Sequence, residues 1–290
     1  MGNINSNRQL NLPIPHYTTI LTKDMLNDIR DDRKIKNLII PHSITRIEKQ
    51  AFDWCRHLKS IILPNSIETI GELAFYGCEN LKTIHLPHNI TTIDRGTFEN
   101  CKSLTQVTLP NNLHTIGASA FKRCKNLTSI TIPDSVTSIG EGTFEDCTSL
   151  TTITIPNGVT SIGRRAFKNC SSLTSITIPN GVTSIGEGTF QYCTSLTTIT
   201  IPNGVTSIRV GTFSYCENLT DITIPDSVTS IGPAAFAVCT SLTSITISNG
   251  VTSIGVGAFH GCTSLTSITI PDSVTRIEDS VFRECFSLTS

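Results

Sequence analysis

Apolar residues return at the same positions every 23 residues along most of this chain. Residues 127–149 show the unit, in which Leu127, Ile130 and Ile132 form an L-x-x-I-x-I segment that alternates apolar and polar positions toward its end. A short alternating segment rich in Thr and Ile predicts a β-strand, and Pro133 ends that strand. Each unit therefore begins with one short strand.

The rest of the unit predicts a turn, a second extended segment and a tight bend. An Asp-Ser or Asn-Gly pair follows the proline and supplies turn chemistry. Val136 and Ile139 point a second extended segment inward, and Gly140 permits a bend without steric conflict. Phe144 and Cys147 stand three residues apart, which predicts one helical or 3₁₀ turn.

The same register covers nearly the whole chain and predicts a solenoid. Eleven full turns occupy 35–287, and a twelfth begins at 288. Each turn carries one cysteine at the same apolar position, three residues after a phenylalanine. The odd number of cysteines and their equivalent positions favour reduced, buried thiols that act as small hydrophobic side chains. The cysteines are Cys55, Cys78, Cys101, Cys124, Cys147, Cys170, Cys193, Cys216, Cys239, Cys262 and Cys285.

The unit L-x-x-I-x-I-P-x-x-V-x-x-I-G-x-x-(A/T)-F-x-x-C resembles the 23-residue class of leucine-rich repeat found in BspA-like and treponemal surface proteins. The resemblance covers 35–287 and recurs eleven times. It implies an α/β repeat solenoid: a right-handed leucine-rich-repeat horseshoe with a parallel β-sheet on its concave face and short helical or 3₁₀ turns elsewhere. It also implies protein binding or cell adhesion rather than catalysis.

The two ends of the chain depart from the repeat. Residues 1–34 are predicted to be a tail and a capping helix, and residues 35–290 the solenoid. The segment 22–30 predicts a short amphipathic helix with Thr22 as its N-cap and Met25 and Ile29 on one face. At the other end, the sequence stops just inside a twelfth turn, which indicates either a fragment or an open turn that pairs with another chain.

The N-terminal segment also bears on location. It has no apolar core typical of a secretory signal, and no stretch approaches the ~20 apolar residues of a membrane span. A cytoplasmic location is therefore expected, with surface or extracellular display as the alternative that the family resemblance implies. Gly2 begins a match to the short M-G-x-x-x-[ST] pattern for N-myristoylation, which would give only weak membrane association.

Charge is balanced overall but not along the chain. The net charge is −1, so no bulk field attracts nucleic acid. Residues 1–126 carry 16 Lys and Arg against 11 Asp and Glu, a net of +5. Residues 127–290 carry 6 against 12, a net of −6. This polarity favours either head-to-tail association or an oriented encounter with a partner, unless it merely reflects drift between older and newer repeats.

No cluster of ionisable groups suggests catalysis. The Gly-x-Gly pairs match neither a dinucleotide fingerprint nor a P-loop. His85 and His88 stand in one turn and His114 in the next, without an evident third metal ligand. We therefore predict that the chain is not an enzyme and that it has no cofactor or metal site.

Two surfaces are candidates for binding a partner. The first is the outward face of the strands, where residues with hydroxyl groups flank each inward isoleucine. Its candidate residues are Ser129, Thr131, Thr152, Thr154, Ser175, Thr177, Thr198 and Thr200. The simpler interpretation is that β-branched Thr suits a strand and its cross-strand neighbours. Ice binding by a regular Thr-x-Thr array is a third interpretation, which the curvature of a leucine-rich-repeat sheet disfavours.

The second candidate surface is the position immediately before each cysteine, which we call the pre-Cys column. Trp54, Arg123, Tyr192 and Tyr215 stand there, whereas other turns have mostly small or polar residues. Aromatic and Arg side chains are typical interface anchors, with ordinary packing between adjacent turns as the alternative. The leading hypothesis is thus a non-enzymatic module that binds an unidentified protein. The alternative is a structural protein that self-assembles through its open C-terminal turn.

Overall fold

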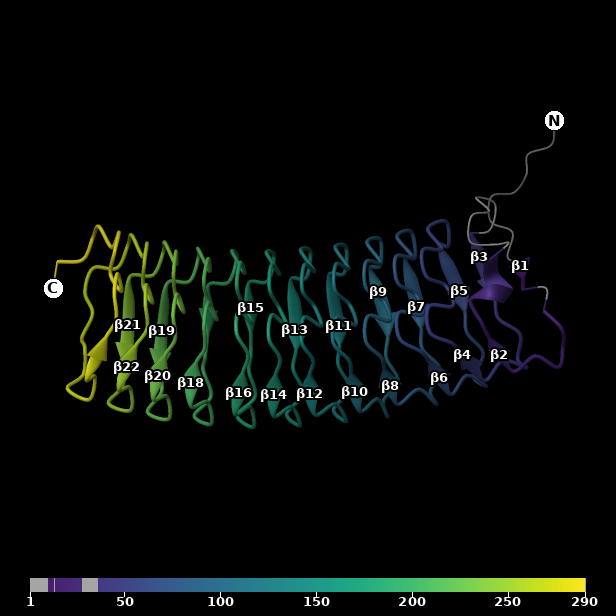
Figure 1. Ribbon diagram of the computed structural model, residues 1–290, viewed down its shortest axis with the longest axis horizontal. Helices are drawn as coiled ribbons and strands as arrows, with labels where there is room; N and C mark the ends of the chain where they lie inside the picture. The colour runs from purple at the N-terminus through teal and green to yellow at the C-terminus, as the bar shows by residue number, and fades with distance from the viewer. Residues whose placement is uncertain (1–9, 13, 28–35, 290) are drawn as a thin grey trace, which may run out of the picture.

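The computed structural model describes residues 10–12, 14–27 and 36–289 (Figure 1). It is a parallel β-solenoid in which similar turns stand side by side along one long axis. Each full turn contributes one strand to each of two rows, except that the last turn contributes to the second row alone. The predicted repeat solenoid is confirmed, while its right-handed horseshoe shape and concave sheet stay predictions.

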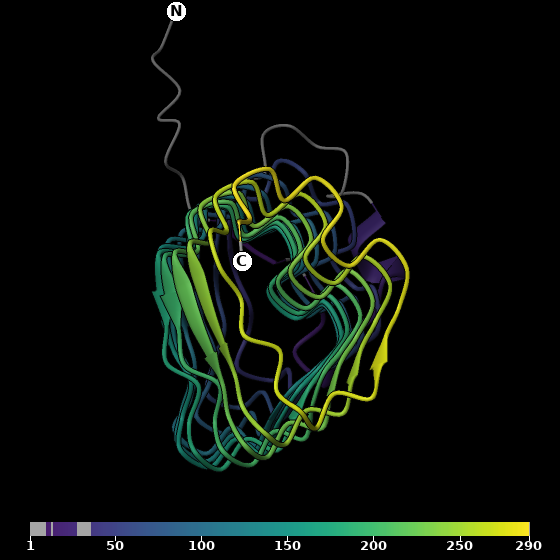
Figure 2. The same ribbon diagram turned by 90° about the vertical axis from the view of Figure 1, so that its left-hand side faces the viewer.

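The first strand row comes from the L-x-x-I-x-I segments. Seen along the axis, green strands β19 and β21 of this row lie on one side, and yellow β23 of the other row lies opposite (Figure 2). Its strands are β1 (Leu10–Asn11), β3 (Asn37–Ile39), β5 (Ser60–Ile62), β7 (Thr83–His85), β9 (Gln106–Thr108), β11 (Ser129–Thr131), β13 (Thr152–Thr154), β15 (Ser175–Ile176), β17 (Thr198–Ile199), β19 (Asp221–Ile224) and β21 (Ser244–Ile247).

The second strand row comes from the extended segment after the Asp-Ser or Asn-Gly turn. Its strands are β2 (Ile20–Leu21), β4 (Arg46–Ile47), β6 (Thr69–Ile70), β8 (Thr92–Ile93), β10 (Thr115–Ile116), β12 (Ser138–Ile139), β14 (Ser161–Ile162), β16 (Ser184–Ile185), β18 (Ser207–Ile208), β20 (Ser230–Ile231), β22 (Ser253–Ile254) and β23 (Arg276–Ile277). Both extended segments predicted for each unit are therefore present in most turns.

Both rows pair in parallel, mostly in a register that advances by one repeat. Ile130 of β11 lies opposite Ile153 of β13, and Ile139 of β12 lies opposite Ile162 of β14. The inward residue of each strand thus stacks on the equivalent residue of the next turn. The hydrogen bonding is interrupted, so the first row divides into a five-stranded sheet and three pairs.

The predicted helical turns around Phe and Cys are wrong. Among the described residues, the helical ones are the 3₁₀ helix η1 (Asp24–Leu26) and Asn27 directly after it, and none of them belongs to a repeat turn. In a typical turn, the Cys147 amide donates to Phe144 O within the turn, while the Phe144 amide donates to Ala166 O of the next turn. Gly142 and Asp146 have φ of 58° and 61°, and these left-handed residues interrupt any right-handed helix.

The core consists of stacked columns of identical side chains. Phenylalanine rings of successive turns are parallel, with centroids 5.7 Å apart for Phe167 and Phe190, and both side chains are fully buried. Ten cysteines add a second column, in which each thiol donates to the phenylalanine carbonyl of the preceding turn, as from Cys193 Sγ to Phe167 O at 3.2 Å. All eleven cysteines are free thiols, and all but the half-buried Cys285 are buried, as predicted.

Glycine after the second strand has a different role from the predicted bend. At Gly140 a Cβ atom would lie 3.0 Å from Ala118 N in the preceding turn. At Gly186 it would lie 2.6 Å from Arg164 Cα and would overlap Arg164 N. The residue is glycine because two backbones approach closely here, and not because the chain needs a positive φ.

The N-terminal segment packs on the first turn without the predicted helix face. Strands β1 and β2 extend the two rows, and η1 buries Leu26 while Met25 is 44% exposed. The residue at the start of η1 is Lys23, without a side-chain cap, so the predicted N-cap at Thr22 is wrong. Lys23 Nζ instead forms an ion pair with Asp53 Oδ2 at 2.9 Å. Ile29 and Gly2 lie outside the described residues.

Candidate functional site

The hydroxyl-bearing face of the first strand row is exposed and regular. All eight predicted residues on it are exposed, whereas the isoleucines between them are buried. Parallel pairing places Ser129 opposite Thr152 and Thr131 opposite Thr154. The face is therefore a ladder of near-identical side chains, and its role in binding stays a prediction.

The pre-Cys column has a backbone feature that the sequence analysis missed. Its residue has positive φ in every turn, from 56° at Trp54 to 71° at Gly261. Glycine, asparagine and aspartate tolerate this left-handed conformation best, and they occupy Gly77, Asn100 and Asp146. The presence of glycine, asparagine and aspartate at this position is the sequence signal that could have predicted the positive φ.

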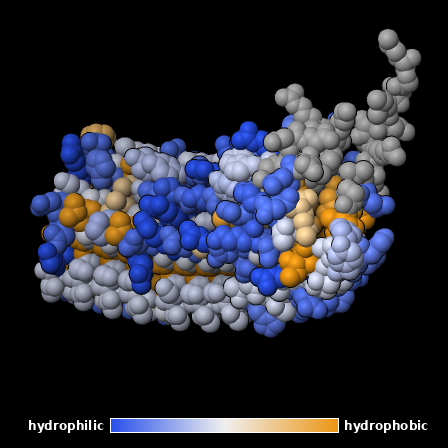
Figure 3. Space-filling model, turned by 45° about the vertical axis from the view of Figure 1, so that its right-hand side comes forward, coloured by the Kyte–Doolittle hydropathy of each residue, from blue (hydrophilic) through white to orange (hydrophobic). Residues whose placement is uncertain are grey.

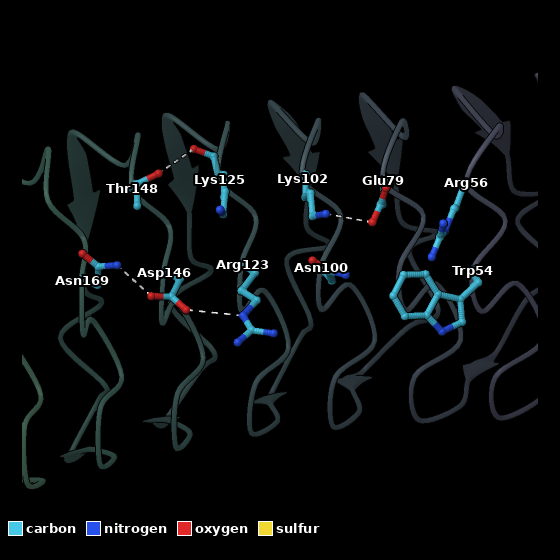
Figure 4. A pocket seen from close by; sticks show the side chains of 10 residues that line it. All are labelled: Trp54, Arg56, Glu79, Asn100, Lys102, Arg123, Lys125, Asp146, Thr148 and Asn169. Carbon is cyan, nitrogen blue, oxygen red and sulfur yellow. Dashed lines mark hydrogen bonds and ion pairs between the residues drawn. The ribbon is translucent and has the colours of Figure 1, made fainter.

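A groove with a volume of about 470 Å³ runs along the pre-Cys column (Figure 4). Its other wall is the position immediately after each cysteine, which we call the post-Cys column. Side chains from six successive turns point into it, and it spans the turns of Trp54 to Asn169. The lining residues are Trp54, Arg56, Glu79, Asn100, Lys102, Arg123, Lys125, Asp146, Thr148 and Asn169.

Trp54 closes one end of this groove as a packed wall. A Cβ on Gly77 of the next turn would lie 2.6 Å from Trp54 Cε3, so the indole ring rests directly against that backbone. Arg56 places its guanidinium carbon 4.6 Å from the ring centroid, and Tyr76 meets the ring edge-on at 5.1 Å. Trp54 thus positions Arg56 by a cation–π contact more than it offers a free aromatic face.

Four cations and two carboxylates line the groove. Glu79 Oε1 holds Lys102 Nζ at 2.9 Å, and Asp146 Oδ2 holds Arg123 Nε at 3.5 Å. The Asn169 side-chain amide donates to the other Asp146 oxygen at 2.8 Å. The groove therefore has a net positive charge and a mixture of donors and acceptors (Figure 4).

Tyr192 and Tyr215 continue the pre-Cys column beyond the groove. Their rings stack with centroids 4.5 Å apart and an interplanar angle of 20°. Lys168 Nζ lies 5.8 Å from the Tyr192 ring centroid. The structure thus brings Trp54 and Arg123 into one groove and leaves the two tyrosines as a separate half-buried pair on the following turns.

The surface outside the groove is uneven in polarity. In Figure 3, strongly hydrophilic side chains gather on one face above a pale band along the lower edge, the edge where Figure 1 places β8 to β16.

Among the described residues, no group of three or more His, Cys, Asp or Glu could hold a metal ion. Within the same residues, no helix is long and apolar enough to cross a membrane.

Comparisons with known proteins agree on one family. The model of the BspA type leucine-rich repeat region matches residues 30–135, 114–242 and 206–290. A leucine-rich cell surface protein of Faecalibacterium prausnitzii is 32% identical with a TM-score of 0.61, and the match covers 85% of this chain and 82% of that one. No curated protein matches.

Two further crystal structures share the fold. A leucine-rich repeat protein of Bacteroides ovatus is 28% identical, with a TM-score of 0.72 and coverage of 97% of this chain and 85% of that one. One from Eubacterium ventriosum is 26% identical, with a TM-score of 0.59 and coverage of 89% and 85%. Because the family model spans nearly all of the repeats, the chain belongs to the BspA-type leucine-rich repeat family.

Proposed function

We propose that this solenoid is a non-enzymatic recognition module that binds a protein partner along the groove between Trp54 and Asn169. One observation carries the proposal: the groove is lined by two positions whose residues change from turn to turn. Charged, amide and aromatic side chains are mixed in the groove, whereas the hydroxyl-bearing face of the first strand row repeats Ser and Thr. Variation on a rigid frame gives a surface the selectivity that a uniform ladder lacks.

The Ser/Thr face remains a weaker candidate for the same function. Its side chains are exposed, but β-branched Thr is also the residue that a half-exposed strand favours for packing alone. This face could add contact area to an interface, but its uniform side chains would not select one partner over another. We therefore propose the groove as the main binding surface and this face as a secondary one.

The family favours a location outside the cytoplasm for this function. The relative from Faecalibacterium prausnitzii is described as a cell surface protein. We therefore propose display at a cell surface, in preference to the cytoplasmic location that the N-terminal sequence led us to expect. On a cell surface, binding of a protein partner by this module would serve cell adhesion.

A photo-crosslinking residue in the groove tests the proposal. Thr148 is half-buried, lines the groove and carries no charge, so a photoreactive amino acid at this position leaves the charged groups intact. The matched control is Thr137, which is exposed beside the second strand row. We expect a discrete crosslinked partner from position 148 that is absent from position 137 and weakened by Arg123→Glu. Equal labelling from both positions would contradict the proposal.

Self-assembly is a second candidate function, favoured by the surface of the last described turn. Phe286 is 80% exposed, Ile277 is 49% exposed, and Phe282 is only partly buried. Exposed apolar groups of this kind can associate with a second copy. The opposite net charges of the two parts of the chain would orient such a contact head to tail.

A further inference from the structure

We propose that the occupant of the groove is an extended acidic segment of the partner protein, with two carboxylate side chains four residues apart. This inference rests on the proposed function and specifies the ligand of the same site. It follows from two cations in the groove that no described carboxylate neutralises, from one amide that lines the groove and from the spacing of the turns.

Among the described residues, two of the four cations in the groove have no carboxylate partner. Glu79 neutralises Lys102 and Asp146 neutralises Arg123. Arg56 contacts only the Trp54 ring through its charge, and Lys125 is exposed; within the described chain, neither forms an ion pair. Arg56 and Lys125 are therefore available to an incoming anion.

Three further lysines stack in the first three full turns, which also supply part of the groove lining. Lys36, Lys59 and Lys82 occupy the same position of three successive turns, because the Lys59 amide donates to Lys36 O at 2.6 Å and the Lys82 amide to Lys59 O at 3.0 Å. Stacked like charges are destabilising. No ion pair joins these lysines to a carboxylate in the part of the chain that the structure describes, and the next turn has Thr105 instead. Such an arrangement favours an anionic ligand.

The side-chain amide of Asn100 fits a peptide backbone. Asn100 is only 8% exposed, lines the groove and makes no side-chain hydrogen bond with any described residue. Its amide is open to the groove rather than sealed in the core, so a peptide N–H and C=O could pair with both of its polar atoms. Figure 4 shows Asn100 between Arg56 and Lys125 along the groove.

The spacing of the turns sets the spacing of the acidic residues. Arg56 and Lys125 occupy the same position three turns apart, which at ~4.8 Å per turn separates them by about 14 Å. An extended peptide advances about 3.4 Å per residue, so side chains four residues apart lie on one face at nearly this distance. The whole groove spans five turn spacings, about 24 Å, and accommodates roughly seven residues.

The carboxylates in the groove argue against a continuous polyanion. Glu79 lies between Arg56 and Lys125 along the post-Cys column, and Asp146 lies just beyond Lys125. A nucleic acid or a sulfated glycan carries charge at every unit and would meet both carboxylates. A peptide with neutral residues between two acidic ones avoids them.

Fluorescence anisotropy with labelled nine-residue peptides tests the inference. The peptides carry two Glu residues spaced by two, four or six positions in a neutral background, at low salt. We expect the four-residue spacing to bind roughly tenfold more tightly than the others, since each charge-assisted hydrogen bond adds about a factor of ten. Arg56→Gln and Lys125→Gln should each remove most of this preference. Arg209→Gln is the matched control, because Arg209 is exposed and has no carboxylate partner in the described chain.

Each other outcome overturns a defined part of the argument. Equal binding at all three spacings excludes the four-residue spacing. Tighter binding of a heparin fragment or an RNA oligonucleotide of the same charge excludes the acidic peptide. If no peptide binds while position 148 still crosslinks a partner, the acidic segment is wrong and the proposed function stands. If neither experiment gives a signal at the groove, both proposals fail.

Discussion

At the scale of the residue, the pre-Cys column stores backbone strain. A left-handed backbone is unfavourable for most side chains and worst for β-branched ones. Val238 nevertheless has φ of 59°, and Tyr192 and Tyr215 have φ of 62° and 61°. Neighbouring turns hold these residues in place through the amide-to-carbonyl bonds of the same segment, such as Val238 N–H to His260 O at 2.7 Å. The strain is therefore compensated by hydrogen bonds to the next turn.

The buried thiols are the other repeated residue with a chemical consequence. Burial raises the pKa of the Cys193 thiol from 9.0 to about 12, against a smaller lowering by its backbone hydrogen bond. Burial also raises the pKa of Cys170 and Cys216, to which neighbouring cysteines add. Thiols that stay protonated are poor nucleophiles, so the ladder is a packing device rather than a reactive one.

These thiols make stability dependent on alkaline pH. The folded pKa lies above the unfolded one, so each neutral thiol contributes its full stability below about pH 8.5 and loses it as the pH rises toward the folded value. Per thiol, we expect the free energy of unfolding to fall by about 1.4 kcal/mol per pH unit above that point. Urea midpoints at roughly pH 7 and pH 10 would measure it. Cys193→Ala should reduce the slope by the share of one thiol, about 1.4 kcal/mol per pH unit, and an unchanged slope would contradict the assignment.

Part of the candidate site could be predicted from residues alone. Trp54 and Arg123 stood out because they interrupt a repeat, and both line the groove. The groove itself could not be predicted, because it depends on how the side chains of the pre-Cys and post-Cys columns come together in space. Arg56 and Lys125 were missed because charged residues in an exposed turn carry no periodic signal.

At the scale of the element, most turns contact the next turn through two strands and through one close backbone approach at the glycine after the second strand. The strands were predictable, since alternation and a terminal proline identify them. The turn around Phe and Cys was mistaken for a helix, because a spacing of three residues fits a β-turn as well as a helical turn. Only the backbone bonds to the next turn, such as Phe144 N–H to Ala166 O at 2.8 Å, distinguish the two structures.

The close contact after the second strand is open to a direct test. Gly186→Ala places a Cβ 2.6 Å from Arg164 Cα, so one backbone must move. We expect a loss of about 1–3 kcal/mol in the free energy of unfolding, as for other overpacked sites. Gly181→Ala is the matched control, since its nearest atom would be 3.4 Å away. Equal denaturant midpoints for the two variants would show that the turns are not in close contact here.

At the scale of the whole molecule, the variable and the uniform surfaces overlap along the array. The first six full turns line the groove, and the stacked lysines stand in the first three. From the turn of Ser129 onward, the outward positions of the first strand row are Ser or Thr except at Asp221. A repeat array stabilises each turn through its neighbours, so uniform turns can support a variable surface elsewhere in the array.

Association of whole molecules has its own prediction. If the last described turn contacts a second copy, the chain should form oligomers at low salt that decline as salt screens the opposite charges. Light scattering at low and high salt measures this. The variant Phe286→Glu with Leu288→Lys should remain monomeric, and Val256→Glu is the control at another exposed apolar side chain. A native chain that is monomeric at high concentration removes self-assembly as a function.

The backbone bonds of both strand rows join each turn to the next, along the long axis of the molecule. Tension applied along that axis would load and break these hydrogen bonds one turn after another, rather than all at once. Each turn that opens would release 23 residues, or about 80 Å of extended chain. A protein built in this way would yield gradually under load and extend to many times its resting length while its remaining turns stay folded.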